Sequence, residues 1–188
     1  MNAIHQFTLS QQLAIVYIFY CIKQPLPATN EIQFTAANAG DARVVLGQAG
    51  QAAERLSFDH RVDDPHEVQR IVDAGGFCWK NRVMGVLAVT RALGDQRLKE
   101  FVIAEPYVKQ VTIPVSNRNR TKPTERTAED ESFVILACDG LFDVMSDQEA
   151  VDIVRNFDGE KTRVAERLVQ EGIRRGTADN LTVIVAWP

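Results

Sequence analysis

From residue 34 onward, apolar residues cluster in short runs that are separated by turns, a pattern typical of strands. Five such runs predict strands, at 34–38, 43–46, 83–89, 133–138 and 181–187. The first two flank a turn at Gly40 and Asp41, so we expect them to be neighbours in a sheet.

A first helix is predicted after residue 64, where Asp64 can cap, Pro65 suits the first turn and Glu67 completes a capping box. Its apolar stripe is formed by Val68, Ile71 and Val72. Two glycines, Gly75 and Gly76, end it.

Two further helices are predicted in the last third of the chain. Ser146 and Glu149 form a second capping box, and 161–175 is amphipathic with Gly176 at its end. Helices that lie between and after short strands favour an α+β fold with antiparallel sheets.

Residues 1–33 do not follow this pattern. The apolar stretch 13–22 would span about 15 Å as a helix, half of the roughly 30 Å hydrocarbon core, so we do not expect it to cross a membrane. It also lacks the basic flank and cleavage site of a signal peptide. We interpret it as a buried or artefactual segment, with an interfacial or signal-like role as the open alternative.

Composition narrows the choice of partners and compartment. The net charge of −4 over 188 residues gives no reason to expect nucleic acid or anionic lipid. Three cysteines without metal-ligand spacing, Cys21, Cys78 and Cys138, suit a reducing compartment, and we expect Cys138 to be a buried apolar group. The histidines show no ligand spacing either, so we expect surface or turn positions for His5, His60 and His66. The polar segment 117–131 holds eight charges and predicts a surface loop.

Four aspartates lie where apolar runs begin or end: Asp41, Asp139, Asp143 and Asp179. Two carboxylates about 5 Å apart repel by about 3 kcal/mol at an effective dielectric of about 20, and a divalent cation reverses the sign. Because all candidate ligands are oxygens, Mg²⁺ or Mn²⁺ is favoured over zinc. Such ions can activate water and neutralise phosphoryl oxygens, although this spacing alone does not name a reaction.

The chain closely resembles the metal-dependent protein serine/threonine phosphatases of the type 2C (PPM) family, and its fungal members in particular. The resemblance covers 34–188. It is carried by four main stretches: Asn38-Ala39-Gly40-Asp41-Ala42-Arg43, 85–95 (GVLAVTRALGD), 137–143 (ACDGLFD) and 177–182 (TADNLT).

The resemblance implies two antiparallel β-sheets in a sandwich flanked by α-helices, with metals in a cleft at one end. By motif position, Asp139 and Asp179 look like ligands of a first Mg²⁺ or Mn²⁺, and Asp41 and Asp143, with Asp139, like a third-metal site. Arg82 lies where the family has an arginine near the substrate. The implied activity is hydrolysis of phosphoserine and phosphothreonine in phosphorylated protein substrates, in signalling, by a monomer of the cytoplasm or nucleus.

The chain also departs from the family, because the Asp-Gly-His-Gly-Gly motif and the preceding phosphate and metal ligands are absent from this sequence. We therefore divide it into an unmatched segment, 1–33, and a partial phosphatase domain, 34–188, whose N-terminal strands we expect to be missing, with open sheet edges. The alternative function is that of a truncated, catalytically inactive relative, either a pseudophosphatase binding module or an incomplete gene model.

Overall fold

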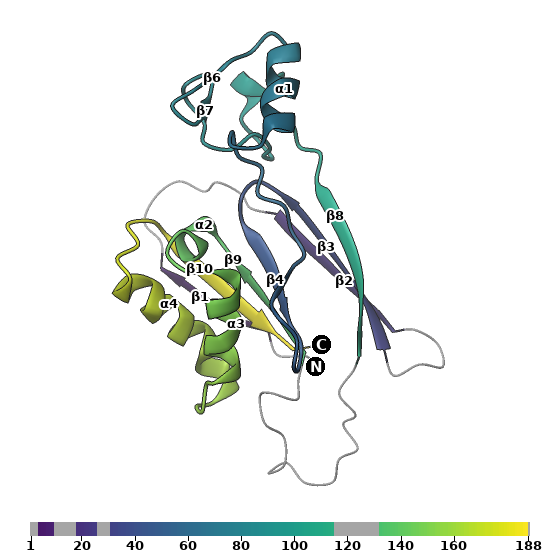
Figure 1. Cartoon of the computed structure of the whole chain (residues 1–188), viewed down its shortest axis with the longest axis vertical. Helices are drawn as coiled ribbons and strands as arrows, with labels where there is room; N and C mark the ends of the chain where they lie inside the picture. The colour runs from purple at the N-terminus through teal and green to yellow at the C-terminus, as the bar shows by residue number, and fades with distance from the viewer. Residues whose placement is uncertain (1–3, 10–17, 26–30, 115–131, 188) are drawn as a thin grey trace.

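The computed structural model describes residues 4–9, 18–25, 31–114 and 132–187 (Figure 1). The strands are β1 (Ile4–Leu9), β2 (Ile18–Pro25), β3 (Glu31–Ala39), β4 (Arg43–Gly47), β5 (Glu54–Arg55), β6 (Cys78–Trp79), β7 (Arg82–Val83), β8 (Tyr107–Pro114), β9 (Phe133–Ala137) and β10 (Leu181–Ala186). The helices are α1 (Pro65–Asp73), α2 (Asp139–Phe142), α3 (Asp147–Arg155) and α4 (Val164–Arg174), with short 3-10 turns η1 (Gln96–Leu98) and η4 (Lys161–Arg163).

The larger sheet is antiparallel and has the strand order β1-β10-β9-β4-β5. Both faces of its middle strands are buried. On β4, Val45 packs among the helices, whereas its neighbours Val44 and Leu46 turn to the opposite face. Helices α2, α3 and α4 cover the first of these faces (Figure 1), and their apolar side chains share a core with Ile135 of β9 and Val183 of β10.

The second sheet, β2-β3-β8, packs against the other face of the first and completes a sandwich. Ile32 and Phe34 of β3 and Ile113 of β8 pack with Leu46 and Val134 from the larger sheet. The alternation of buried positions along β3 follows from its pleat, which turns every second side chain toward the core. The expected two-sheet α+β architecture is confirmed.

A smaller unit, residues 62–106, projects from one end of the sandwich, and we call it the flap (Figure 1). It contains α1, the hairpin β6–β7 and η1, and it has its own core of Ile71, Val83, Val89, Ala92 and Val102. Beside this core, the carboxylate of Glu67 is 4% exposed and accepts hydrogen bonds from Arg91 at 2.7 Å, Thr90 at 2.7 Å and Arg70 at 3.0 Å.

Two local predictions in the flap are wrong. The run 83–89 does not continue as a strand, because Met84 and Gly85 take positive φ values of 52° and 70° and the chain turns back on itself after β7. Glu67 does not complete a capping box, since Arg70, Thr90 and Arg91 draw its carboxylate into the flap interior. Asp64 does cap α1, through the His66 amide.

The capping box of α3 is confirmed, with Ser146 and Glu149 bonding each other's backbone amides. The third helix begins as the 3-10 turn η4 and continues as α4. In α1, the predicted stripe is only partly inward, since Ile71 is fully buried and Val72 is 50% exposed.

In the described part of the chain, segments of 1–33 supply neighbours for β10 and β3, so these strands are not the edges of their sheets; the outer strands are β1, β5, β2 and β8. β1 pairs with β10, and β2 pairs with β3 along its whole length. The segment 18–25 contains isoleucine, phenylalanine and tyrosine, which favour an extended strand. It therefore joins the sheet, although it lies outside the regular pattern of apolar runs that begins at residue 34. The rest of the apolar stretch, 13–17, and the polar loop 117–131 lie outside the described residues.

No helix in the described part of the chain is long and apolar enough to cross a membrane.

Candidate metal centre

The turn between β3 and β4 is held by the side chain of Asn38. This buried amide accepts a hydrogen bond from the Phe58 amide at 3.0 Å and donates to the carbonyl oxygens of Phe58 at 2.6 Å and Gly40 at 3.2 Å. Gly40 has φ of 120°, a conformation that glycine adopts without a steric penalty. The turn thereby presents Asp41 to the end of the sandwich and fixes the segment after β5 beside it.

That neighbouring segment carries His60 and Arg61. His60 is only 1% exposed, and its Nδ1 lies 2.9 Å from the Gly40 carbonyl oxygen. Burial lowers the pKa of its imidazole. Of the expected surface or turn position for His60, the surface alternative is wrong; the side chain anchors the segment to the turn that carries Asp41.

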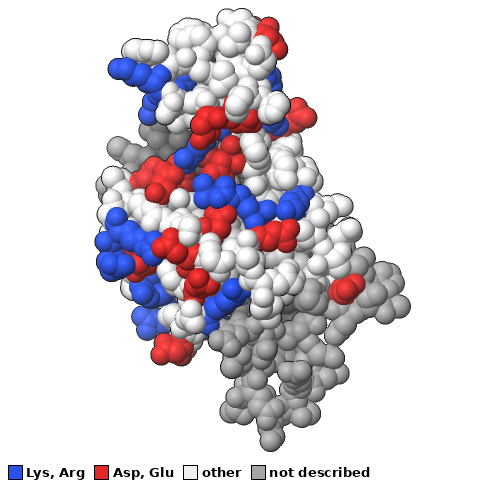
Figure 2. All heavy atoms as spheres, viewed as in Figure 1, with Lys and Arg blue, Asp and Glu red and all other residues white. Residues whose placement is uncertain are grey.

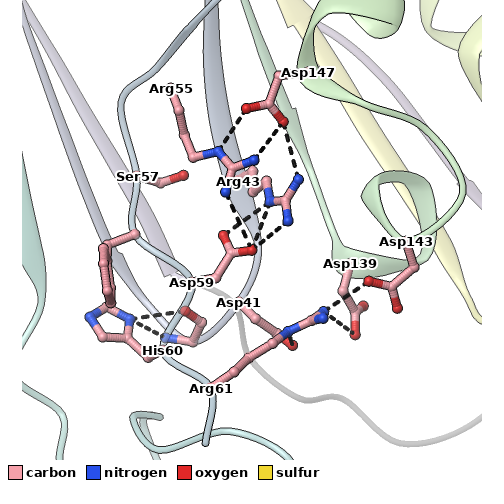
Figure 3. A network of polar contacts seen from close by, with 12 residues as sticks. Asp41, Arg43, Arg55, Ser57, Asp59, His60, Arg61, Asp139, Asp143 and Asp147 are labelled. Atoms are coloured by element: carbon pink, nitrogen blue, oxygen red, sulfur yellow. Dashed lines mark hydrogen bonds and ion pairs between the residues drawn. The ribbon is translucent and has the colours of Figure 1, made fainter. Parts of the chain in front are cut away.

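An ion-pair network fixes the same segment from the other side (Figure 3). Arg43 donates to Asp59 at 2.6 and 2.8 Å and to Asp147 at 3.1 Å, and Arg55 donates to Asp147 at 2.7 Å. These pairs tie β4 and the segment after β5 to the first turn of α3. Partly buried, multiply bonded pairs of this kind hold geometry better than single exposed ones.

Asp139 and Asp179 approach each other because Gly140 has no side chain. A Cβ atom at position 140 would lie 2.3 Å from the Asn180 carbonyl oxygen and 3.3 Å from Cβ of Asp179. The adjacent Cys138 is buried, as predicted; its thiol donates to the Asn180 carbonyl at 3.0 Å and accepts from the Thr182 amide at 3.3 Å. The end of β9 and the start of β10 are thus held in contact at the site.

Arg61 lies among three of the four predicted ligands (Figure 3). Its Nε is 2.8 Å from Oδ2 of Asp41, and its Nη2 is 3.1 Å from Oδ1 of Asp143 and 3.7 Å from Oδ2 of Asp139. Burial opposes the charge on Arg61, but Asp41 and Asp143 outweigh it and raise the guanidinium pKa. The sequence pattern gave no indication of a role for Arg61 at this site. The signal that could have found it is its position directly after Asp59 and His60, a pair that also matches the family resembled by this sequence.

The carboxylates are poorly compensated despite this arginine. Burial, together with the negative charges of Asp41, Asp179 and Asp143, raises the pKa of Asp139 to about 6, although Arg61 opposes the shift. Burial also raises the pKa of Asp41, whose side chain is 3% exposed. Oδ1 of Asp41 is a buried oxygen without a hydrogen-bond partner among the described residues. A buried acceptor without a hydrogen-bond partner lowers the stability of the folded protein unless another group binds to it.

A cavity of about 240 Å³ opens at this point between the sandwich and the flap. It is lined by Asp41, Arg61, Val62, Asp63, Asn81, Ala88, Asp139 and Asp143. Figure 2 shows acidic and basic side chains gathered together in the band between the two units. Arg82 is exposed and donates to the Val86 carbonyl oxygen within the flap at 2.8 Å; its neighbour Asn81, rather than Arg82 itself, lines the cavity.

Three of the predicted ligands, Asp41, Asp139 and Asp143, come together around Arg61, and Asp179 lies near Asp139, so that three separate parts of the chain contribute. Their oxygens suit a hard divalent cation, and the unpaired Asp41 oxygen and the raised Asp139 pKa indicate a deficit of positive charge. Within the described residues, no three carboxylate, imidazole or thiol groups are already grouped as a metal-binding set. The carboxylate oxygens fit a hard divalent cation, and in this structure Arg61 provides the positive charge between Asp41, Asp139 and Asp143.

Comparison with known proteins gives a consistent result. The family model described as "Protein phosphatase 2C" matches residues 26–181. The curated relative "Protein phosphatase 2C homolog 1" of Schizosaccharomyces pombe is 48% identical over 157 residues, which cover 84% of this chain and 41% of the relative. The Saccharomyces cerevisiae protein of the same name is 39% identical over 160 residues, which cover 85% of this chain and 51% of the relative. The chain thus spans about half the length, or less, of these relatives.

Solved structures show the same fold. A phosphatase from a pathogenic strain of Toxoplasma gondii aligns with a TM-score of 0.70 at 28% identity, over 84% of this chain and 48% of that one. The structure titled as a C. elegans sex determining protein aligns with a TM-score of 0.67 at 27% identity, over 82% of this chain and 36% of that one.

Proposed function

This chain belongs to the protein phosphatase 2C family, and on that premise we propose that it hydrolyses phosphoserine and phosphothreonine in proteins with the help of Mg²⁺ or Mn²⁺. The observation that supports the proposal most directly is that Asp41, Asp139 and Asp143 line one cavity at the end of the sandwich, with Asp179 near Asp139. One buried oxygen of Asp41 has no hydrogen-bond partner among the described residues. The relatives named above are phosphatases, so the comparisons do not favour the catalytically inactive alternative.

Each residue has a proposed role. Asp139 and Asp179 hold one divalent cation, and Asp41 and Asp143, with Asp139, hold another. When bound, such ions supply activation of water and neutralisation of phosphoryl oxygens. Gly140 sets the separation of Asp139 and Asp179, and Asn38 and His60 fix the turn that carries Asp41.

The proposed substrate is a phosphorylated side chain that enters between the flap and the sandwich. The cavity of about 240 Å³ gives access for a phosphoryl group, and Arg82 lies in the flap hairpin next to the cavity-lining Asn81. Its guanidinium is exposed, so it can contact a bound phosphoprotein by turning away from Val86. We further propose that the protein acts as a monomer in the cytoplasm or nucleus, in keeping with its scattered cysteines.

The direct test is Mn²⁺-dependent release of phosphate from an aryl phosphate and from a phosphothreonine peptide. We expect the wild-type chain to turn over both substrates, and Asp139→Asn to lose at least about 100-fold in kcat/KM, because this carboxylate is shared by both proposed ion sites.

The matched control is Asp158→Asn, which removes one carboxylate in an exposed loop after α3 and should leave turnover unchanged. Equal activity of Asp139→Asn and wild type would contradict the proposed site. Absence of turnover by the wild-type protein on both substrates, at saturating Mn²⁺, would contradict the proposed function of this chain.

A further inference from the structure

We propose that Arg61 is a tethered cation that competes with a divalent cation for Asp41, Asp139 and Asp143, so that an ion binds at these carboxylates only when the guanidinium leaves them. The inference rests on the proposed metal site and adds to it a regulating residue, whose release sets the affinity of that site.

The geometry shows direct competition for the same oxygens. Arg61 contacts Oδ2 of Asp41, Oδ1 of Asp143 and Oδ2 of Asp139 within 2.8 to 3.7 Å. A divalent ion needs ligand oxygens at about 2.0–2.6 Å from itself. Within the described residues no three such ligands are grouped closely enough to hold an ion as they stand. An ion that drew these oxygens to that distance would take the place of the guanidinium, because two cations cannot occupy it together.

A second observation distinguishes this cluster from an ordinary arginine–aspartate pair. Oδ1 of Asp41 has no partner among the described residues although its side chain is 97% buried. Arg61 satisfies the other oxygen, Oδ2, and leaves this one without a partner. A cation that bound both carboxylate oxygens of Asp41 would therefore satisfy Oδ1 as well as Oδ2, whereas Arg61 satisfies Oδ2 alone.

The side chain of Arg61 can move away from the three carboxylates while its backbone stays in place. Its backbone is held by an antiparallel bridge to Val89 of the flap, and the neighbouring Thr90 amide bonds the His60 carbonyl at 2.8 Å. The side chain itself is 28% exposed and borders the cavity. Rotation into the cavity, toward Asp63, therefore releases the three aspartates while the segment stays in place.

The test is calorimetric titration of the purified chain with Mn²⁺ at low ionic strength, in wild type and in Arg61→Met, which keeps an unbranched side chain without the charge. We expect the Kd of one class of sites to fall at least about tenfold in Arg61→Met, equivalent to about 1.4 kcal/mol. Arg97→Met, which removes an exposed flap arginine, should leave every Kd unchanged.

A double-mutant cycle tests whether the gain in Mn²⁺ affinity arises at the carboxylates that Arg61 contacts. Adding Asp143→Asn to Arg61→Met should abolish the gain in affinity, since Asp143 is one of the three carboxylates that Arg61 contacts. Arg61→Lys keeps the charge but reaches fewer oxygens, so its Kd should lie between those of wild type and Arg61→Met.

Thermal melting supplies a readout that does not depend on turnover. Without metal, Arg61→Met should melt below wild type, because three carboxylates lose their counter-charge, and saturating Mn²⁺ should raise its melting temperature more than that of wild type. If Arg61→Lys folds where Arg61→Met does not, the same comparison is made between Arg61→Lys and wild type.

The outcomes separate this inference from the proposed function. An unchanged or higher Kd in a folded Arg61 variant, or no Mn²⁺ binding by either protein, would overturn the competition. A lower Kd in Arg61→Met would support it even if the chain hydrolysed no phosphate ester, in which case only the proposed function would fail.

Discussion

Individual residues at turns hold the geometry of the candidate site, and most of them are not themselves predicted ligands. Asn38 clamps the turn that carries Asp41, and His60 anchors the next segment to the same turn. Gly140 allows Asp139 and Asp179 to meet. A substitution at one of these positions would move a ligand without touching it.

Glu67 is a residue for which the structure predicts a pH-dependent contribution to stability. Burial alone would raise the pKa of its carboxyl, but hydrogen bonds from Arg91, Arg70 and Thr90 hold it at about 2, against an ordinary value of 4.5. Because the pKa is lowered in the folded state, this contribution is fully present above about pH 4.5 and is lost as the pH falls toward 2.

We therefore expect Glu67→Gln to reduce the free energy of unfolding by about 2–3 kcal/mol at pH 7, as measured by urea denaturation, since two arginines lose their shared partner. The difference from wild type should shrink between pH 4.5 and pH 3. The control Glu100→Gln changes an exposed flap glutamate and should have little effect at either pH. A difference that did not depend on pH would contradict the assignment.

At the residue level, the aspartates could be predicted from sequence because each follows or precedes an apolar run. Arg61 and the buried role of His60 could not, because they depend on how the segment after β5 folds back onto the β3–β4 turn. Likewise, the local pattern around Glu67 matches a capping box, and only the tertiary contacts with Arg91 and Thr90 decide where its side chain goes.

Among the secondary-structure elements, α2 packs closely against Asn180, the residue directly before β10. Glycine in a helix is normally less favourable than alanine by about 1 kcal/mol, so propensity alone predicts that Gly140→Ala stabilises the protein. The structure predicts instead that Gly140→Ala destabilises the protein, because the added Cβ would lie 2.3 Å from the Asn180 carbonyl oxygen.

We expect Gly140→Ala to cost about 1–3 kcal/mol in urea denaturation, the usual penalty of overpacking. Gly172→Ala is a matched comparison, because its Cβ would meet only the side-chain ends of Leu181 and Leu141, at 3.2 Å or more, and it should cost less. Greater stability of Gly140→Ala than of wild type would show that the two elements are less closely packed than described.

Elements with a single dominant pattern were predictable, as α3 with its capping box and β9 with its unbroken apolar run show. The run 83–89 was not, because its apolar side chains pack into the flap core from a chain that turns at Met84 and Gly85. Pairing of β2 with β3 was also missed, since the sequence of 18–25 indicates an extended strand but does not name its neighbour.

The whole molecule is built around separate hydrophobic cores, and this division predicts unequal local stability. The flap core contains five fully or nearly fully buried side chains, whereas the core between the larger sheet and the helices contains more than three times as many. Regions with fewer buried contacts open more readily than the global fold.

Hydrogen exchange measured by mass spectrometry should therefore show faster exchange in α1 than in β9, under conditions where exchange reports the opening equilibrium. Peptides that cover 65–73 and 133–137 provide the comparison. Equal opening free energies in the two peptides would mean that flap and sandwich unfold as one cooperative unit.

The position of β10 in the larger sheet has a consequence for how the protein folds. This strand lies between β1 and β9, yet it is formed by residues 181–186, far along the chain from the residues 4–9 with which it pairs. Contacts of such long sequence separation slow folding. During synthesis, β4 and β9 can pair before residues 181–186 are made, but β9 would lack its second neighbour in the sheet until those residues had left the ribosome.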